Sequence, residues 1–164
     1  MLGRETLREI RADMAHMQLP SWVAPAPRNP GEAKRGKFTA DQWRSFCTIN
    51  LVFTLTRLWG SYPDGSRHRL MLDNFIHLVT AVKLASMRCM SSDRIASYTF
   101  HMHQYLSGLP GLYPAASITP NHHLTLHFQT FLERFGPVHA WRCFPFERYN
   151  LLLQKTPTNQ KIGK

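Results

Sequence analysis

The chain has 164 residues, 43% of them hydrophobic, which is enough for one compact domain with a single core. Lysine and arginine number 20 against 10 aspartates and glutamates, so the formal net charge is +10 with the nine histidines neutral. This balance favours polyanions or acidic protein surfaces as partners. The alternative is that the basic side chains only face solvent and bind no specific partner.

Cysteine usage and hydrophobic run length exclude several classes of protein. Cys47, Cys89 and Cys143 stand far apart, which fits neither a disulfide framework nor a CxxC metal site, so we expect reduced thiols in an intracellular protein. The N-terminus has no apolar signal segment, and no apolar stretch approaches the roughly 20 residues of a membrane span. No membrane contact is expected.

An amphipathic helix and an extended arm are predicted first. Leu7, Ile10, Met14 and Met17 recur at helical spacing over residues 4–18, and Pro20 stops the pattern. Four prolines and two glycines between residues 20 and 37 then favour an extended arm. Because Trp22 and Val23 are apolar, we expect part of this arm to pack onto the main body.

Two long helices are predicted next. Thr39-Ala-Asp-Gln42 matches a capping box, which starts a helix that we expect to end at Gly60 and to lie in the interior. Turn residues follow over residues 61–66, and a second helix is predicted from about Leu70 to about Cys89.

The second half of the chain predicts two more helices and a loop. Ser91 caps a helix expected to end before Gly108, and paired Pro and Gly residues over 107–118 indicate a loop. Thr119-Pro120 begins a helix that leads to Gly136.

Residues 138–143 alternate weakly and favour a short strand, and Pro145 opens a last helix through Leu153.

The predicted fold is therefore mainly α: an orthogonal bundle of about five helices. Its segments are an N-terminal helix over residues 1–19, a Pro-rich arm over 20–37 and a helical domain over 38–164. The predicted core consists of large apolar side chains, namely Trp43, Phe46, Leu51, Phe75, Val79, Tyr98, Phe128 and Phe131.

One pair of histidines has the spacing of metal ligands. His123 and His127 share a helix face at i and i+4, so both could reach one ion, with His139 or Cys143 as a further ligand. No HExxH glutamate accompanies them. The alternative is that they are hydrogen-bonded histidines on a half-buried helix face.

The ten acidic residues do not form an evident catalytic pair. Glu5, Glu9 and Asp13 are expected on the exposed face of the first helix, and Asp41 and Asp93 are expected as first-turn charges. Asp64 falls in a turn.

Glu147 differs because aromatic residues surround it in the sequence; it either serves a site or pairs with Arg142 or Arg148. Phosphate-binding loops and nucleophile motifs are lacking, so the residues support no catalytic assignment.

Short basic clusters are the candidates for contact with nucleic acid. They lie in the arm, before the second long helix, and in the tail over residues 155–164. The residues selected for such contact are Lys34, Arg35, Lys37, Arg67 and Arg69.

Two segments resemble a known family. Asn121-His-His-Leu-Thr-Leu-His127 and the stretch Gly-Pro-Val-His-Ala-Trp-Arg-Cys-Phe-Pro-Phe-Glu-Arg-Tyr-Asn over 136–150 resemble the uncharacterised domain that follows the transposase domain in En/Spm (CACTA) transposable elements, fungal branch. Softer matches over 19–23, 36–43 and 58–59 extend the resemblance over nearly the whole chain. Its motif residues are His123, His127, His139, Trp141, Pro145, Phe146 and Arg148.

The resemblance implies a role beside an RNase H-like catalytic region that binds Mg²⁺ or Mn²⁺. Glu147 would then be the third carboxylate of that region, because it follows several helices and starts one. The first two acids are lacking here, and similar relatives continue past Lys164, so we expect a truncated copy. One carboxylate does not suffice for two-metal chemistry.

The resulting hypothesis is a nuclear, non-catalytic helical accessory or insertion module of a CACTA-type transposase, with no cofactor of its own. It would contact DNA or complete a split catalytic domain. The alternative is a decayed element fragment that acts as a helical protein-interaction module.

Overall fold

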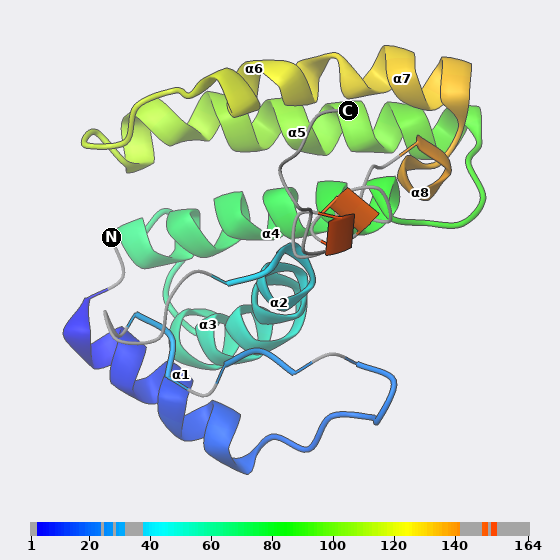
Figure 1. Ribbon diagram of the computed structural model, residues 1–164. Helices are drawn as coiled ribbons and strands as arrows, with labels where there is room; N and C mark the ends of the chain where they lie inside the picture. The colour runs from blue at the N-terminus through cyan, green and yellow to red at the C-terminus, as the bar shows by residue number, and fades with distance from the viewer. Residues whose placement is uncertain are drawn as a thin grey trace, which may run out of the picture.

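The computed structural model describes residues 3–23, 25–27, 29–31, 38–141, 149–150 and 152–153. Over these ranges the chain is mainly helical and contains no strand, which confirms the predicted α class (Figure 1). The elements are α1 (Arg4–His16), α2 (Ala40–Ser45), η2 (Phe46–Asn50), α3 (Leu51–Trp59), α4 (Arg67–Ala85), α5 (Ser92–Leu112), α6 (Pro120–Leu126), α7 (Phe128–Phe135) and α8 (Val138–Trp141).

Helix α4 lies in the middle of the molecule. Figure 1 shows α5 beside it on one face, with α6 and α7 running along the far side of α5. On the other face of α4 lie α2 and α3, and α1 forms the outer layer there. The chain therefore stacks its helices in layers on both sides of one central helix.

Side-chain caps begin most of the long helices, as the sequence predicts. Thr39 accepts a hydrogen bond from the Gln42 amide at 3.3 Å, and Gln42 accepts one from the Thr39 amide at 3.0 Å, so the capping box is confirmed. Ser91 caps α5 in the predicted place. Ser66 caps α4, which therefore starts before the predicted Leu70.

The helix from residue 40 to residue 59 contains a π segment that the sequence did not indicate. In η2 the Leu51 amide bonds to the Phe46 carbonyl, one residue further back than in an α-helix. Phe46 is buried, whereas Trp43 is 51% exposed, so its predicted place in the core is wrong. Trp43 instead lies against Phe38 at the surface, with the ring centroids 4.9 Å apart.

Helix α5 continues through the predicted loop. It ends at Leu112 and not before Gly108, because Gly108 serves helix packing here and does not terminate the helix. Asn74 of α4 donates a hydrogen bond to the Tyr105 carbonyl at 2.9 Å, and this close approach leaves no room for a side chain at position 108. Pro110 stands in the last turn, where its missing N–H removes a single helical bond.

The chain after Thr119 forms two short helices and a helical turn. His127 separates α6 from α7, where one helix was predicted. Gly136, at φ 73°, ends α7 as expected. The predicted strand over 138–143 is wrong for its described part, because residues 138–141 form α8 and the Trp141 indole donates to the Gly136 carbonyl at 3.1 Å.

The last predicted helix begins at Pro145, which lies outside the described residues. Residues 149–150 and 152–153 are helical.

Two clusters of buried side chains share α4. The first joins α1, the arm, η2, α3 and the start of α4; the second joins the end of α4 with α5 and α7. Of the predicted core, Phe46, Leu51, Val79 and Tyr98 are buried, and Phe75, Phe128 and Phe131 are half-buried.

The arm packs through residues other than the predicted tryptophan. Ala26 is buried in the first cluster, and Arg11 of α1 donates to the Pro30 carbonyl at 2.9 Å. The expected packing of part of the arm onto the main body is therefore confirmed, and Val23 is half-buried, but Trp22 is 84% exposed and does not contribute to it.

Candidate nucleic-acid interface

A groove lies between α2, the C-terminal end of α4 and α8. It consists of two adjoining hollows of about 460 Å³ and about 670 Å³, which share Arg44 and Ser86 as lining residues. We call it the basic groove and define it by Trp22, Arg44, Lys83, Arg88 and His139, which line one or both hollows. Segments far apart in the sequence therefore meet along one concave surface.

The charges on the described residues of the basic groove are of one sign. Arg44, Lys83 and Arg88 are exposed, and no aspartate or glutamate is among the described residues that line it. Arg44 lies 3.6 Å from Asp41, but both side chains are half exposed, so water screens this ion pair. Within the described ranges, Lys83 and Arg88 have no carboxylate partner. These cations are therefore available to an anion.

Apolar side chains stand beside these cations. Trp22 at the edge of the basic groove is almost fully exposed, and Met87 next to Arg88 is partly exposed. An exposed tryptophan beside cationic groups is a surface on which an unpaired base can stack. The basic groove thus combines charge with one aromatic face.

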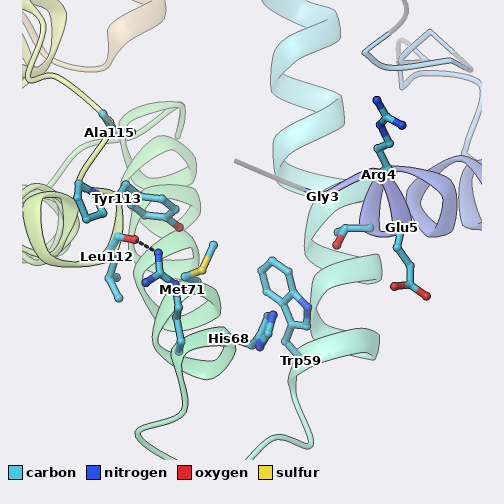
Figure 2. Close-up of a pocket in the computed structure, with 13 residues that line it drawn as sticks. Gly3, Arg4, Glu5, Trp59, His68, Met71, Leu112, Tyr113 and Ala115 are labelled. Atoms are coloured by element: carbon cyan, nitrogen blue, oxygen red, sulfur yellow. Dashed lines mark hydrogen bonds between the residues drawn. The ribbon is translucent and has the colours of Figure 1, made fainter.

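A second cavity, of about 570 Å³, lies between the start of α1, the start of α4 and the end of α5. Figure 2 shows Trp59 and His68 side by side at its wall, with Arg4 directed away from them. Arg67 of this wall donates to the Leu112 carbonyl at 3.0 Å, the dashed contact in Figure 2. This hydrogen bond joins the start of α4 to the end of α5 at the cavity.

The two described arginines among the predicted nucleic-acid residues have partners within the chain. Arg67 bonds to Leu112, and Arg69 donates to Asp73 at 3.1 Å and to the Gly60 carbonyl at 2.9 Å. Their contact with nucleic acid stays a prediction. Lys34, Arg35 and Lys37 lie outside the described residues.

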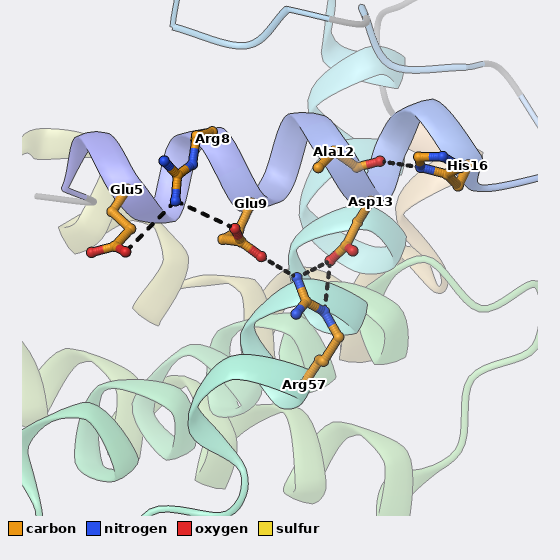
Figure 3. A network of polar contacts seen from close by, with 7 residues as sticks. All are labelled: Glu5, Arg8, Glu9, Ala12, Asp13, His16 and Arg57. Atoms are coloured by element: carbon orange, nitrogen blue, oxygen red, sulfur yellow. Dashed lines mark hydrogen bonds and ion pairs between the residues drawn. The ribbon is translucent and has the colours of Figure 1, made fainter.

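Two acidic residues of α1 form ion pairs with α3. Figure 3 shows Arg57 of α3 reaching between Glu9, at 2.9 Å, and Asp13, at 3.0 Å. These hydrogen bonds raise the pKa of Arg57 above its ordinary value. The expected solvent-facing position of Glu9 and Asp13 is therefore wrong: both face α3, while Glu5 remains exposed.

The predicted histidine pair is brought together at the surface. The Nε2 atoms of His123 and His127 are 3.2 Å apart, and both side chains are exposed and not half-buried. His139 lines the basic groove and does not join them. In the described ranges no group of three or more His, Cys, Asp or Glu side chains is placed to hold a metal ion.

Part of the predicted motif can be located and part cannot. Trp141 packs against Phe128 and Phe131, with ring centroids 5.4 Å and 5.8 Å away, so it anchors α8 on α7. The predicted catalytic residue Glu147 lies outside the described residues, as do the motif residues Pro145, Phe146 and Arg148 and the candidate partners Arg142 and Cys143.

No protein-family model, no curated protein and no solved structure matches the chain. No helix in the described part of the chain is both long and apolar enough to cross a membrane.

The groove cations were not selected from the sequence. Arg44, Lys83 and Arg88 stand singly, each separated from other cations, whereas the predicted contact residues come from short basic clusters. The available signal was weak: Arg44 is in the last turn of α2 and Lys83 in the last turn of α4, where basic residues also complement the helix dipole.

Proposed function

We propose that the chain is a non-catalytic helical module that contacts the phosphate backbone of DNA through the basic groove. One observation carries this proposal: three cations from different segments line one groove whose described residues include no carboxylate. The net charge of +10 supports it, because the whole molecule then attracts a polyanion.

The resemblance to CACTA elements supplies the setting for this role. In such an element the chain would be a nuclear accessory or insertion module beside the transposase catalytic region. Mg²⁺ or Mn²⁺ would belong to that region and not to this chain. We further propose that the layered helices form an orthogonal bundle, which interhelical angles from an experimental structure would test.

Contacts with phosphate groups allow a protein to bind DNA without recognising its base sequence. Lysine and arginine displace the counterions condensed on DNA, so affinity falls steeply as salt rises. Three cations that contact three phosphates contribute about 3 to the slope of log affinity against log salt. The proposal therefore predicts binding that depends strongly on salt and weakly on base sequence.

Fluorescence anisotropy with a labelled DNA duplex over a salt series tests this proposal. We expect the triple variant Arg44→Gln, Lys83→Gln, Arg88→Gln to bind more weakly than the wild type and to lower the salt slope by about 3.

A matched control removes three exposed cations elsewhere, with Arg4→Gln, Arg8→Gln and Arg134→Gln, and has the same net charge as the groove variant. It should lose much less affinity. Equal losses in the two variants would show that only net charge matters. No binding at low salt would contradict the proposal and favour a protein-interaction module.

A further inference from the structure

Two exposed histidines at the end of α6 present ring nitrogens to each other. His123 lies in the last turn of α6, and His127 is the residue that follows that helix. Their Nε2 atoms are 3.2 Å apart, and the ring planes stand at 79°. Both side chains are exposed to solvent, so an ion can reach both nitrogens without any opening of the fold.

The separation of these nitrogens suits two ligands of one metal ion. An imidazole nitrogen binds Zn²⁺ at about 2.0–2.1 Å, so two ligands at right angles or at a tetrahedral angle lie about 2.8–3.4 Å apart. The observed 3.2 Å falls inside this interval. Without an ion, the same contact is a hydrogen bond between the two rings, and metal binding replaces it once both rings turn their Nε2 lone pairs towards the ion.

We propose that His123 and His127 form a two-histidine site for a divalent late transition metal ion. Imidazole nitrogen suits Cu²⁺, Ni²⁺ and Zn²⁺, and Cu²⁺ binds most tightly in that series. Each ring binds through Nε2 and keeps its proton on Nδ1. The chain fills two coordination positions, and water fills the others.

The other close histidine pair of the molecule makes a useful contrast. His77 of α4 and His101 of α5 are half-buried, and their Nδ1 atoms are 2.8 Å apart. Both pairs lie within hydrogen-bonding distance, but because His77 and His101 are half-buried, an ion reaches their nitrogens less readily than the exposed nitrogens of His123 and His127. This pair serves as an internal control for the exposed pair.

Metal binding at the exposed pair also fixes the boundary between α6 and α7. The His127 amide donates to the Leu124 carbonyl at 3.1 Å, which tightens the chain there. An ion held by residues on both sides of this turn binds the folded chain more tightly than the unfolded chain. Binding therefore raises the unfolding temperature as the metal concentration rises.

Isothermal titration of the full chain, without a histidine tag and in a non-chelating buffer, tests this site with CuCl₂, NiCl₂ and ZnCl₂. We expect one saturable ion per chain, bound most tightly for Cu²⁺. His123→Ala and His127→Ala should each weaken binding at least about tenfold, because the second ligand acts at a high local concentration only when the first is bound.

Two control variants locate the ion. His101→Ala removes the half-buried pair and His103→Ala removes another exposed histidine; both should bind the ions as tightly as the wild type. The unchanged circular dichroism of each variant verifies folding. The proposal is overturned if no saturable binding occurs, or if His123→Ala and His127→Ala bind as tightly as the controls. It is also overturned if His101→Ala abolishes binding.

Discussion

Gly108 of α5 lies close against Asn74 of α4, and replacing it with alanine tests how rigid that contact is. A methyl group there would overlap with Nδ2 of Asn74 and stand 3.2 Å from its Cγ. Asn74 is buried, and its amide donates the 2.9 Å hydrogen bond to the Tyr105 carbonyl. The side chain must therefore move and lose this bond.

Two opposing effects determine how Gly108→Ala changes the free energy of unfolding. A buried donor that loses its partner costs about 1–3 kcal/mol. Alanine in place of glycine favours a helix by about 1 kcal/mol. We expect Gly108→Ala to lower the free energy of unfolding by up to about 2 kcal/mol, and each kcal/mol lowers the unfolding temperature by about 2–4 °C.

The same substitution three residues later provides the control. A methyl group at Gly111 of the same helix meets no atom within 4 Å, so Gly111→Ala should leave stability unchanged or raise it by up to about 1 kcal/mol. Urea unfolding followed by circular dichroism measures both variants. In an Asn74→Ala background, Gly108→Ala should cost less, because the obstructing amide is gone. Equal stability of the two alanine variants would refute the rigid approach of α4 to α5.

Two further predictions concern titratable groups. Burial, and then the neighbouring His77, lower the pKa of His101 from its ordinary 6.5, so the folded chain binds fewer protons than the unfolded chain. The contribution of His101 to stability is therefore complete above about pH 6.5 and falls as the pH drops towards the lowered pKa of the folded chain. The urea concentration at the unfolding midpoint should decline less over this pH range in His101→Gln than in the wild type. Equal declines in the two proteins would contradict this prediction. Burial raises the pKa of the Cys47 thiol, so exposed Cys89 should react faster than Cys47 with a disulfide reagent at about pH 8. Mass spectrometry of the peptides can measure the two rates separately. Equal rates would show that Cys47 is accessible.

Local chemistry made most helix starts predictable. The caps at Thr39 and Ser91 and the Pro120 start depend on residues within one turn of each other, so they can be recognised from the sequence alone. Gly136 ends α7 for the same reason. The mainly helical class follows from these local signals.

Features that depend on a distant residue were missed. Gly108 looks like a helix stop in the sequence, but Asn74, far away in the chain, determines its role. Glu9 and Asp13 look solvent-exposed on a helical wheel until Arg57 of α3 is placed beside them. Trp43 is apolar and fits the helical period, yet it is 51% exposed, because the burial of a helical residue depends on which distant elements pack against that face.

The same distinction explains why the candidate interface was not found in the sequence. Adjacent cations such as Arg67 and Arg69 attract attention because they are close in the chain, but closeness in the chain also lets nearby carbonyl and carboxylate groups engage them, as Gly60 and Asp73 engage Arg69. Scattered cations can have such neighbours too, as Asp41 lies 3.6 Å from Arg44, but within the described ranges Lys83 and Arg88 have no carboxylate partner. Arg44 and Lys83 line one hollow only because the end of α2 and the π segment η2 lie beside the C-terminal part of α4, and the positions of these two residues in the sequence do not indicate that proximity.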